Sequence, residues 1–291
     1  MKREIMWGIV CGMAAVQGFA ADEGIFTCQV GEFTVHLLVE NQGQGNPSIL
    51  LGASGEVLNR YIPGGTYRSE VNTLLIRSPD RILVIDTGFG GSIFEHLKTL
   101  GVDPSQVDAV LLTHMHGDHI GGLQKGGTAL FPRASVYLAQ QEKAYWTETA
   151  ANHGAVAALA PYGSKVRTFL PRPIGAGEEL FPGIRAMAAF GHTPGHTLYQ
   201  VESKGQKLLI WGDLMHVQDV QFPLPAISVS YDTDPQAAGI IRKQVLDYAV
   251  QNKIPIAGMH LRYPAIGRVT AEGAGYRFSP LTTDAAEGVD G

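Results

Sequence analysis

The sequence has little cysteine and no excess of basic residues, and each shortage excludes a class of protein. Of the two cysteines, Cys11 lies in an apolar N-terminal stretch, so Cys28 alone is left beyond it. An internal disulfide and a thiolate-rich metal site are therefore excluded. Lysine and arginine number 22 against 27 acidic residues, which excludes the basic surface that nucleic-acid binding requires. We expect a small-molecule substrate, and nitrogen and oxygen ligands for any metal.

The sequence also lacks an apolar run long enough to span a bilayer, which takes ~20 residues. The mostly apolar stretch from Ile5 to Ala20 is shorter, contains glycine and glutamine, and follows the basic start Met1-Lys-Arg. Gly18-Phe19-Ala20 supplies small residues where a signal peptidase cleaves. We predict that residues 1–20 are a cleaved signal peptide and that the mature protein is periplasmic or secreted, without stable membrane anchoring. An uncleaved membrane anchor is the alternative.

Internal repeats and long charged or Ser/Pro-rich linkers are absent as well, which favours a single domain over residues 21–291. With 45% apolar and 17% charged residues, the chain can bury a sizeable core. The sequence does not determine the oligomeric state, and a homodimer is one open alternative.

Strand and helix signals alternate in the first half of the chain. Apolar runs at 71–76 and 81–85 flank a short polar segment and predict a hairpin. A capping box formed by Ser92 and Glu95, followed by apolar residues at helical spacing, predicts an amphipathic helix. The next expected elements are a buried strand at 109–112 and a helix opening at 120–123.

The second half repeats this alternation. Residues 201–211 predict a hairpin that ends in Gly212-Asp213, and Asp234-Pro235 begins a helix with one apolar face. A last strand at 254–257 precedes Met259-His260. Two similar halves of this kind predict an α/β protein whose sheets pack face to face with helices outside. In each half, polar residues fall where strands end.

The segment Thr113-His-Met-His-Gly-Asp-His119 gathers ligand-type side chains directly after the strand at 109–112. His114 and His116 are two residues apart, so both rings can reach one ion, while Asp118 and His119 can turn toward a second after the flexible Gly117. Neutral imidazole and carboxylate are ligands that zinc-type ions accept. This spacing favours a metal site over surface histidines gathered by chance.

In order along the chain, the sequence resembles the motifs of the metallo-β-lactamase superfamily at His114-x-His116-x-Asp118-His119, Gly191-His-Thr-Pro-Gly-His196, Gly212-Asp213 and His260. The resemblance runs from about Asn72 to His260 and implies a four-layer αββα sandwich with the site at the sheet edges. Softer segments, such as Trp211-Gly-Asp-Leu-Met-His216, are most similar to the exported enzymes around methyl parathion hydrolase and its lactone- and ester-cleaving relatives.

The resemblance implies two divalent metal ions per chain, with zinc as the first choice over manganese, cobalt and iron. One ion would be held by His114, His116 and His196, and the other by Asp118, His119 and His260. Asp213 would bridge them, and Asp118 and Asp213 would be the catalytic carboxylates.

The function implied is a dinuclear metallo-hydrolase. Two ions that share a carboxylate can share a water and lower its pKa toward ~7, and the resulting hydroxide would open an ester or lactone, such as an acyl-homoserine lactone or an aryl ester. An organophosphate triester hydrolase and a β-lactamase are the alternatives within this chemistry. A persulfide dioxygenase-like oxidoreductase with a single iron is the alternative from another class.

Several other residues could contribute to the site. His192 shares the loop of His196, and we expect it to support a turn or contact a ligand rather than bind metal. His216, three residues after Asp213, could contact substrate or be a packing histidine, and Asp86 is expected to orient the ligand loops. The remaining candidates for substrate contact are aromatic residues that are more often found in cores: Trp146, Phe222 and Tyr263.

Overall fold

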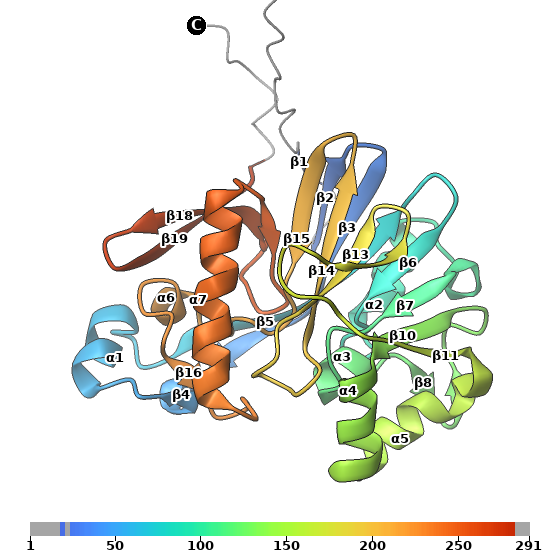
Figure 1. Ribbon diagram of the computed structural model, residues 1–291, viewed down its shortest axis with the longest axis horizontal. Coiled ribbons are helices and arrows are strands. Elements are labelled where there is room, and N and C mark those ends of the chain that lie inside the picture. Colours follow the sequence, from blue (N-terminus) through green and yellow to red (C-terminus); the bar gives the residue numbers. More distant parts are fainter. Residues whose placement is uncertain (1–17, 21–23, 283–291) are drawn as a thin grey trace, which may run out of the picture.

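The computed structural model describes residues 18–20 and 24–282, which form two large sheets packed face to face with helices on both outer sides. Figure 1 shows α7 on one side of the paired sheets and α2 to α5 on the other. The four-layer αββα arrangement is therefore confirmed. The predicted signal peptide lies outside the described residues except for Gly18–Ala20, and export stays a prediction. No helix in the described part of the chain is long and apolar enough to cross a membrane.

The first sheet has eight strands in the order β1-β2-β3-β5-β6-β7-β10-β11. Strands β6, β7, β10 and β11 run parallel to one another, whereas β1, β2, β3 and β5 pair antiparallel. The bounds are β1 Gly18–Ala20, β2 Ile25–Val30, β3 Phe33–Gly45, β5 Tyr67–Arg77, β6 Ile82–Ile85, β7 Ala109–Leu111, β10 Ser135–Ala139 and β11 Val166–Phe169.

The second sheet has seven strands in the order β12-β13-β14-β15-β17-β18-β19, of which β15 and β17 are parallel. Two small two-stranded sheets pair β16 with β4 and β8 with β9. The bounds are β12 Glu178–Phe181, β13 Ile184–Ala188, β14 Thr197–Ser203, β15 Gln206–Ile210, β17 Ile256–Ala257, β18 Ile266–Glu272, β19 Gly275–Pro280, β16 Ser228–Val229, β4 Leu50–Leu51, β8 Gln124–Lys125 and β9 Thr128–Ala129.

The helices are mostly short, and α7 is the longest of those described. The α-helices are α1 Gly55–Tyr61, α2 Ser92–Thr99, α3 Gly117–Ile120, α4 Gln140–Ala144, α5 His153–Leu159, α6 Gln218–Gln221 and α7 Pro235–Gln251. A π-helical turn, Tyr145–Thr149, continues α4, and 3-10 turns occupy Pro47–Ile49, Pro104–Gln106 and Ala160–Lys165. The Asp234 side chain caps α7 by accepting from the Ala237 amide, as the Asp-Pro signal predicted.

Alternation along the first sheet builds two separate cores. Leu74 and Ile76 point between the sheets, whereas Leu75 points outward to the helix layer. The same division separates Leu83 from Val84, because successive side chains of a strand face opposite sides. The central strands are apolar on both faces for this reason, which is typical of a sheet covered on both sides.

Three local predictions are wrong. The capping residue of α2 is Gly91 rather than Ser92, and the carboxylate of Glu40 accepts from the Gly91 and Ile93 amides at 2.6 Å each. A side chain distant in sequence thus replaces the local capping box. The helix expected from residue 120 onward is instead the single turn α3, which ends there. β17 is also not the last strand, since β18 and β19 follow it.

The polar residues of the motifs follow strands whose carboxyl ends meet at one edge. Asp86 follows β6 and His114 follows β7, which are parallel neighbours in the first sheet. Asp213 follows β15 and His260 follows β17, which are parallel neighbours in the second. Parallel strands end on the same side, so the loops from both sheets converge there.

Candidate metal centre

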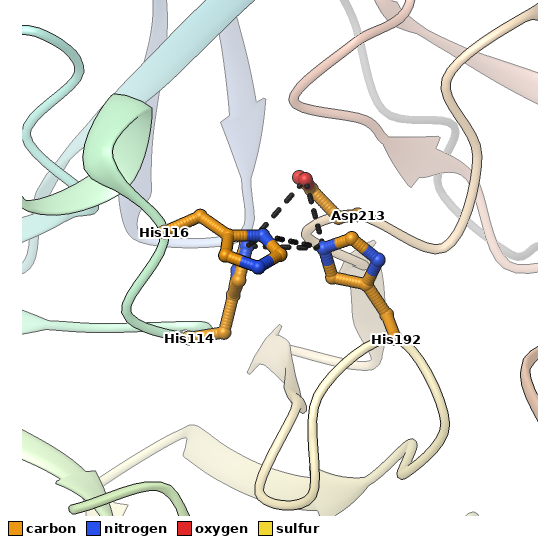
Figure 2. Close-up of side chains that lie close together, drawn as sticks. All are labelled: His114, His116, His192 and Asp213. Atoms are coloured by element: carbon orange, nitrogen blue, oxygen red, sulfur yellow. Dashed lines mark hydrogen bonds and ion pairs between the residues drawn. The ribbon is translucent and has the colours of Figure 1, made fainter. Parts of the chain in front are cut away.

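Imidazoles and carboxylates from separate loops converge at this edge. Figure 2 shows His114, His116 and His192 pointing toward one another, with the Asp213 carboxylate above them. His114 Nε2 lies 3.0 Å from His116 Nδ1 and 3.2 Å from His192 Nε2, and the last two nitrogens are 3.0 Å apart. We call these three residues the histidine group. They come from the loop after β7 and the loop before β14.

A second set lies beside the first. Asp118, His119 and His260, here called the Asp118 group, offer ligand atoms that all lie within 4.8 Å of one another. Asp213 faces both sets: its Oδ1 lies 3.0 Å from His119 Nε2, and its Oδ2 lies 3.0 Å from His260 Nε2 and 3.3 Å from His192 Nε2. Its carboxylate is thus placed to be shared.

The imidazole nitrogens are spaced like the ligand atoms of a metal ion. A Zn–N bond of about 2.0–2.1 Å places the nitrogens of a tetrahedral ion about 3.3 Å apart, close to the spacing in the histidine group. His119 Nε2 and Asp213 Oδ1 are buried and have no hydrogen-bond partner among residues 18–20 and 24–282, although they face each other. Buried polar atoms are normally paired, so this arrangement favours a cation as a partner of both atoms.

The structure corrects the assignment of one ligand: His192, not His196, completes the histidine group. Both nitrogens of His196 are used elsewhere, because Nδ1 bonds to the Ala189 carbonyl and Nε2 accepts from the Asp213 amide at 2.9 Å. That second bond requires a neutral ring, and burial lowers the pKa of His196 to about 3. His196 therefore orients the backbone of Asp213 instead of binding an ion.

Burial and neighbouring charges shift the pKa values of these histidines in opposite directions. Burial lowers the pKa of His114 well below its usual value, and burial together with His192 lowers that of His116 to about 3, so both rings keep a free lone pair. Burial would also lower the pKa of His192, but its contacts with Asp213 and Asp232 outweigh this and raise it to about 9. A metal that binds must displace that proton.

Each imidazole outside His116 is oriented through its other nitrogen. Asp86 bonds to His119 Nδ1 at 2.7 Å and also accepts from the amide and hydroxyl of Thr113, so its expected orienting role is confirmed. Asp232 bonds to His192 Nδ1 at 2.7 Å, and His260 Nδ1 bonds to the Glu70 carbonyl. Such partners fix the ring orientation of metal-binding histidines. Asp232 was missed because no sequence pattern connects it to His192.

A cavity of about 700 Å³ opens above the centre. Its floor contains Asp118, Asp213, His216 and His260, so His216 lies where a bound substrate could reach it. Its wall is formed by aromatic and amide side chains that the sequence did not single out: Tyr67, Phe89, Tyr231, Asn41, Gln44 and Asn46.

The three aromatic candidates for substrate contact do not line this cavity. Phe222 is buried in the core against Trp211 and Phe278, and its assignment is wrong. Tyr263 donates its hydroxyl to the Ile25 carbonyl, outside the cavity. Trp146 packs edge-on against His116, with ring centroids 5.3 Å apart. It therefore contacts a candidate metal ligand without lining the cavity.

Residues 66–252, more than half of the chain, match the model of the metallo-beta-lactamase superfamily. The chain belongs to this superfamily, and its histidine–aspartate clusters are able to hold metal.

Individual proteins match this chain at low sequence identity or over only a small part of its length. A solved structure described as hydrolase AbOPH in the beta-lactamase superfamily is 28% identical, with a TM-score of 0.81 over 90% of this chain and 99% of that one. AidC, a dizinc quorum-quenching lactonase, is 22% identical with a TM-score of 0.80 over 89% and 98%, a likeness of fold. Hydroxyacylglutathione hydrolase of Aeromonas salmonicida (strain A449) is 44% identical over 22% of this chain and 23% of its own. The chain matches between 23% and 41% of the length of its curated relatives Apyc1, TTHA0252 and this enzyme.

Proposed function

We propose that the protein is a dinuclear metallo-hydrolase that opens an ester or lactone. The observation that carries this proposal is the Asp213 carboxylate, whose two oxygens face the Asp118 group and the histidine group at 3.0–3.5 Å. A carboxylate shared in this way fits two cations. When bound, a pair of divalent ions supplies a nucleophile at neutral pH and polarises the bond to be broken. Zinc suits the nitrogen and oxygen ligands.

The chain's own groups complete the reaction. His114, His116 and His192 would hold one ion, His119 and His260 the other with Asp118, and Asp213 would contact both. Asp118 is the ligand carboxylate that lines the cavity and is 23% exposed at its side chain. Burial would raise the pKa of Asp118, but His119 and His260 lower it, so the carboxylate is ionised and would take a proton from the attacking water and pass it to the leaving alcohol.

The wall of the cavity favours a substrate with both apolar and hydrogen-bonding parts. Phe89 and Tyr231 are 55% and 54% exposed, so their rings are available to an acyl or aryl group. Asn41, Gln44 and Asn46 offer amide donors and acceptors on the wall. Such a surface suits a neutral ester or lactone carrying an apolar substituent.

A rate panel on zinc-loaded protein tests the proposal. The substrates are an acyl-homoserine lactone, dihydrocoumarin, p-nitrophenyl acetate, methyl parathion and nitrocefin, with metal per chain measured by mass spectrometry. Fastest turnover of a lactone or aryl ester with two ions bound supports the proposal. Preference for methyl parathion or nitrocefin would replace the substrate class, and a single iron per chain in the protein as purified, before zinc loading, would indicate the oxidoreductase alternative. His116→Ala, which lacks one nitrogen of the histidine group, is the inactive control.

His216 is the residue we propose for contact with the reacting carbonyl. Its ring stacks on His260 with centroids 4.7 Å apart, and Nε2 lies 3.1 Å from Asp213 Oδ2 at the cavity floor. Burial lowers the pKa of His216 to about 4, so the ring is neutral and has a single N–H, which faces Asp213 through Nε2. This N–H would be free for the carbonyl once the cations take up the Asp213 carboxylate.

Replacing His216 with phenylalanine keeps the stacking and removes both nitrogens. We expect kcat/KM to fall about 10- to 100-fold, with two metals still bound. This is the rate effect of losing one hydrogen bond to a charged group or to a charge that develops in the transition state. Steady-state kinetics and metal analysis of the same preparation measure this. Loss of a metal ion would instead make His216 a ligand, and an unchanged rate would leave it as a packing residue.

A further inference from the structure

Glu142 is a buried carboxylate whose four hydrogen bonds connect the two loops of the histidine group. It lies in α4 and has no exposed surface. Its Oε1 accepts from the Met115 amide at 2.9 Å, and its Oε2 accepts from the Thr193 hydroxyl at 2.7 Å and the Gly195 amide at 2.9 Å. Met115 stands between His114 and His116, and Thr193 follows His192. One side chain therefore contacts both segments that supply the histidine group.

The fourth hydrogen bond to Glu142 comes from a side chain that also packs against His116. Trp146, one turn after Glu142, donates its indole N–H to Oε1 at 2.6 Å. The ring of Trp146 packs edge-on against His116 at an interplanar angle of 77°. Glu142 thus fixes the backbone beside His116 and also the aromatic side chain that limits the rotation of its ring. The His116 side chain has no hydrogen-bond partner outside the histidine group among the described residues.

The close approach of the second loop depends on the same residue. A Cβ added to Gly195 would lie 2.2 Å from the Glu142 amide nitrogen and 2.5 Å from its Cβ. The Gly191–His196 loop therefore lies directly against α4, and the carboxylate holds it there. Burying a carboxylate is costly unless every oxygen is satisfied; here donors from three segments satisfy both oxygens, so separating the loops would leave a buried charge unpaired.

We propose that Glu142 is a positioning residue that sets the spacing between His116 and His192 and thereby the metal affinity of the histidine group. The inference rests on the proposed metal centre and not on which ester is cleaved. Asn72 has the corresponding place on the other side, where its amide donates to the carbonyls of Gly258, Met259 and Leu261 around His260. Asn72 in β5 and Glu142 in α4 would thus each fix one ligand loop.

Glu142→Gln tests the proposal, because the amide keeps the shape but replaces one acceptor oxygen with a donor. We expect the affinity for one of the two zinc ions to fall about 10- to 100-fold, the usual effect of losing a partner behind metal ligands, while the other ion binds as before. Zinc titration of the metal-free protein with a competing chelator measures both affinities, independently of any hydrolysis.

Two further variants separate positioning from stability. Glu40→Gln makes the same change at a buried carboxylate that caps α2, and should lower thermal stability without changing zinc affinity. Should Glu142→Gln fail to fold, Trp146→Phe removes a single donor from Oε1 and should weaken one site more mildly.

A double-mutant cycle gives the decisive comparison. In a His116→Ala background, where the histidine group is already incomplete, Glu142→Gln should have little further effect on zinc binding, because both changes act on the same ion. Equal zinc affinity of Glu142→Gln and wild type, or additive effects in the cycle, would overturn the proposal. Absence of hydrolysis on every substrate with the expected zinc affinities would overturn the proposed function alone.

Discussion

Replacing His192 with alanine is expected to lower kcat/KM by about a thousandfold or more and to reduce the metal content of the protein. His192 Nε2 lies within 3.0–3.3 Å of His114, His116 and Asp213, at the centre of the histidine group. Removing it leaves two imidazoles for that ion. A catalytic metal supplies several kcal/mol of transition-state stabilisation, and each 1.36 kcal/mol is tenfold in rate.

His196→Ala is the matched control for this prediction, since it removes the other histidine of the same loop. The substitution leaves the Asp213 amide without its hydrogen-bond acceptor, so we expect the thermal stability of the metal-free protein to fall. The folded fraction should still bind two ions. Metal analysis, kinetics and thermal unfolding of the two variants together distinguish a ligand from a scaffold residue. If His196→Ala loses an ion while His192→Ala keeps both, the exchange of roles described above is incorrect.

The second large effect is expected for Asp213→Asn, which should bind neither ion tightly and lose hydrolysis to a similar or greater extent. Five imidazoles lie within 3.5 Å of its carboxylate: those of His114, His119, His192, His216 and His260. Burial would raise the pKa of Asp213, but these histidines hold it well below its usual value, so the group is an anion at neutral pH. Asparagine keeps the shape and removes the charge that both cations require.

Zinc titration and kinetics across a range of metal concentrations check this result. Excess zinc should restore little activity, because the shared ligand is missing and not merely weakened. Asp86→Asn provides the comparison, because Asp86 acts through its contacts with His119 and Thr113 and belongs to neither ligand set; it should weaken zinc binding only about 10- to 100-fold. An Asp213→Asn protein that retains one tightly bound ion would mean that the carboxylate serves a single metal.

Periodicity and turn signals determined much of the framework. The apolar runs at 71–76 and 81–85 predicted the β5–β6 hairpin, and the Asp234-Pro235 signal placed the start of α7. Local rules failed where a distant side chain intervened, as when Glu40 took the capping role expected of Ser92. Such a contact joins residues about fifty positions apart, and no local pattern encodes it.

The sequence by itself determined the superfamily motifs and the ligand types, because the spacing of histidine and aspartate after a buried strand carries that information. It could not decide between His192 and His196, which are chemically identical and lie four residues apart in one loop. Tertiary structure decided it: the Ala189 carbonyl and the Asp213 amide occupy both nitrogens of His196, whereas Asp232 orients His192 toward the centre. The cavity wall was likewise decided by the packing of β3, β5 and the loops, since substrate-facing surfaces form only when distant segments meet.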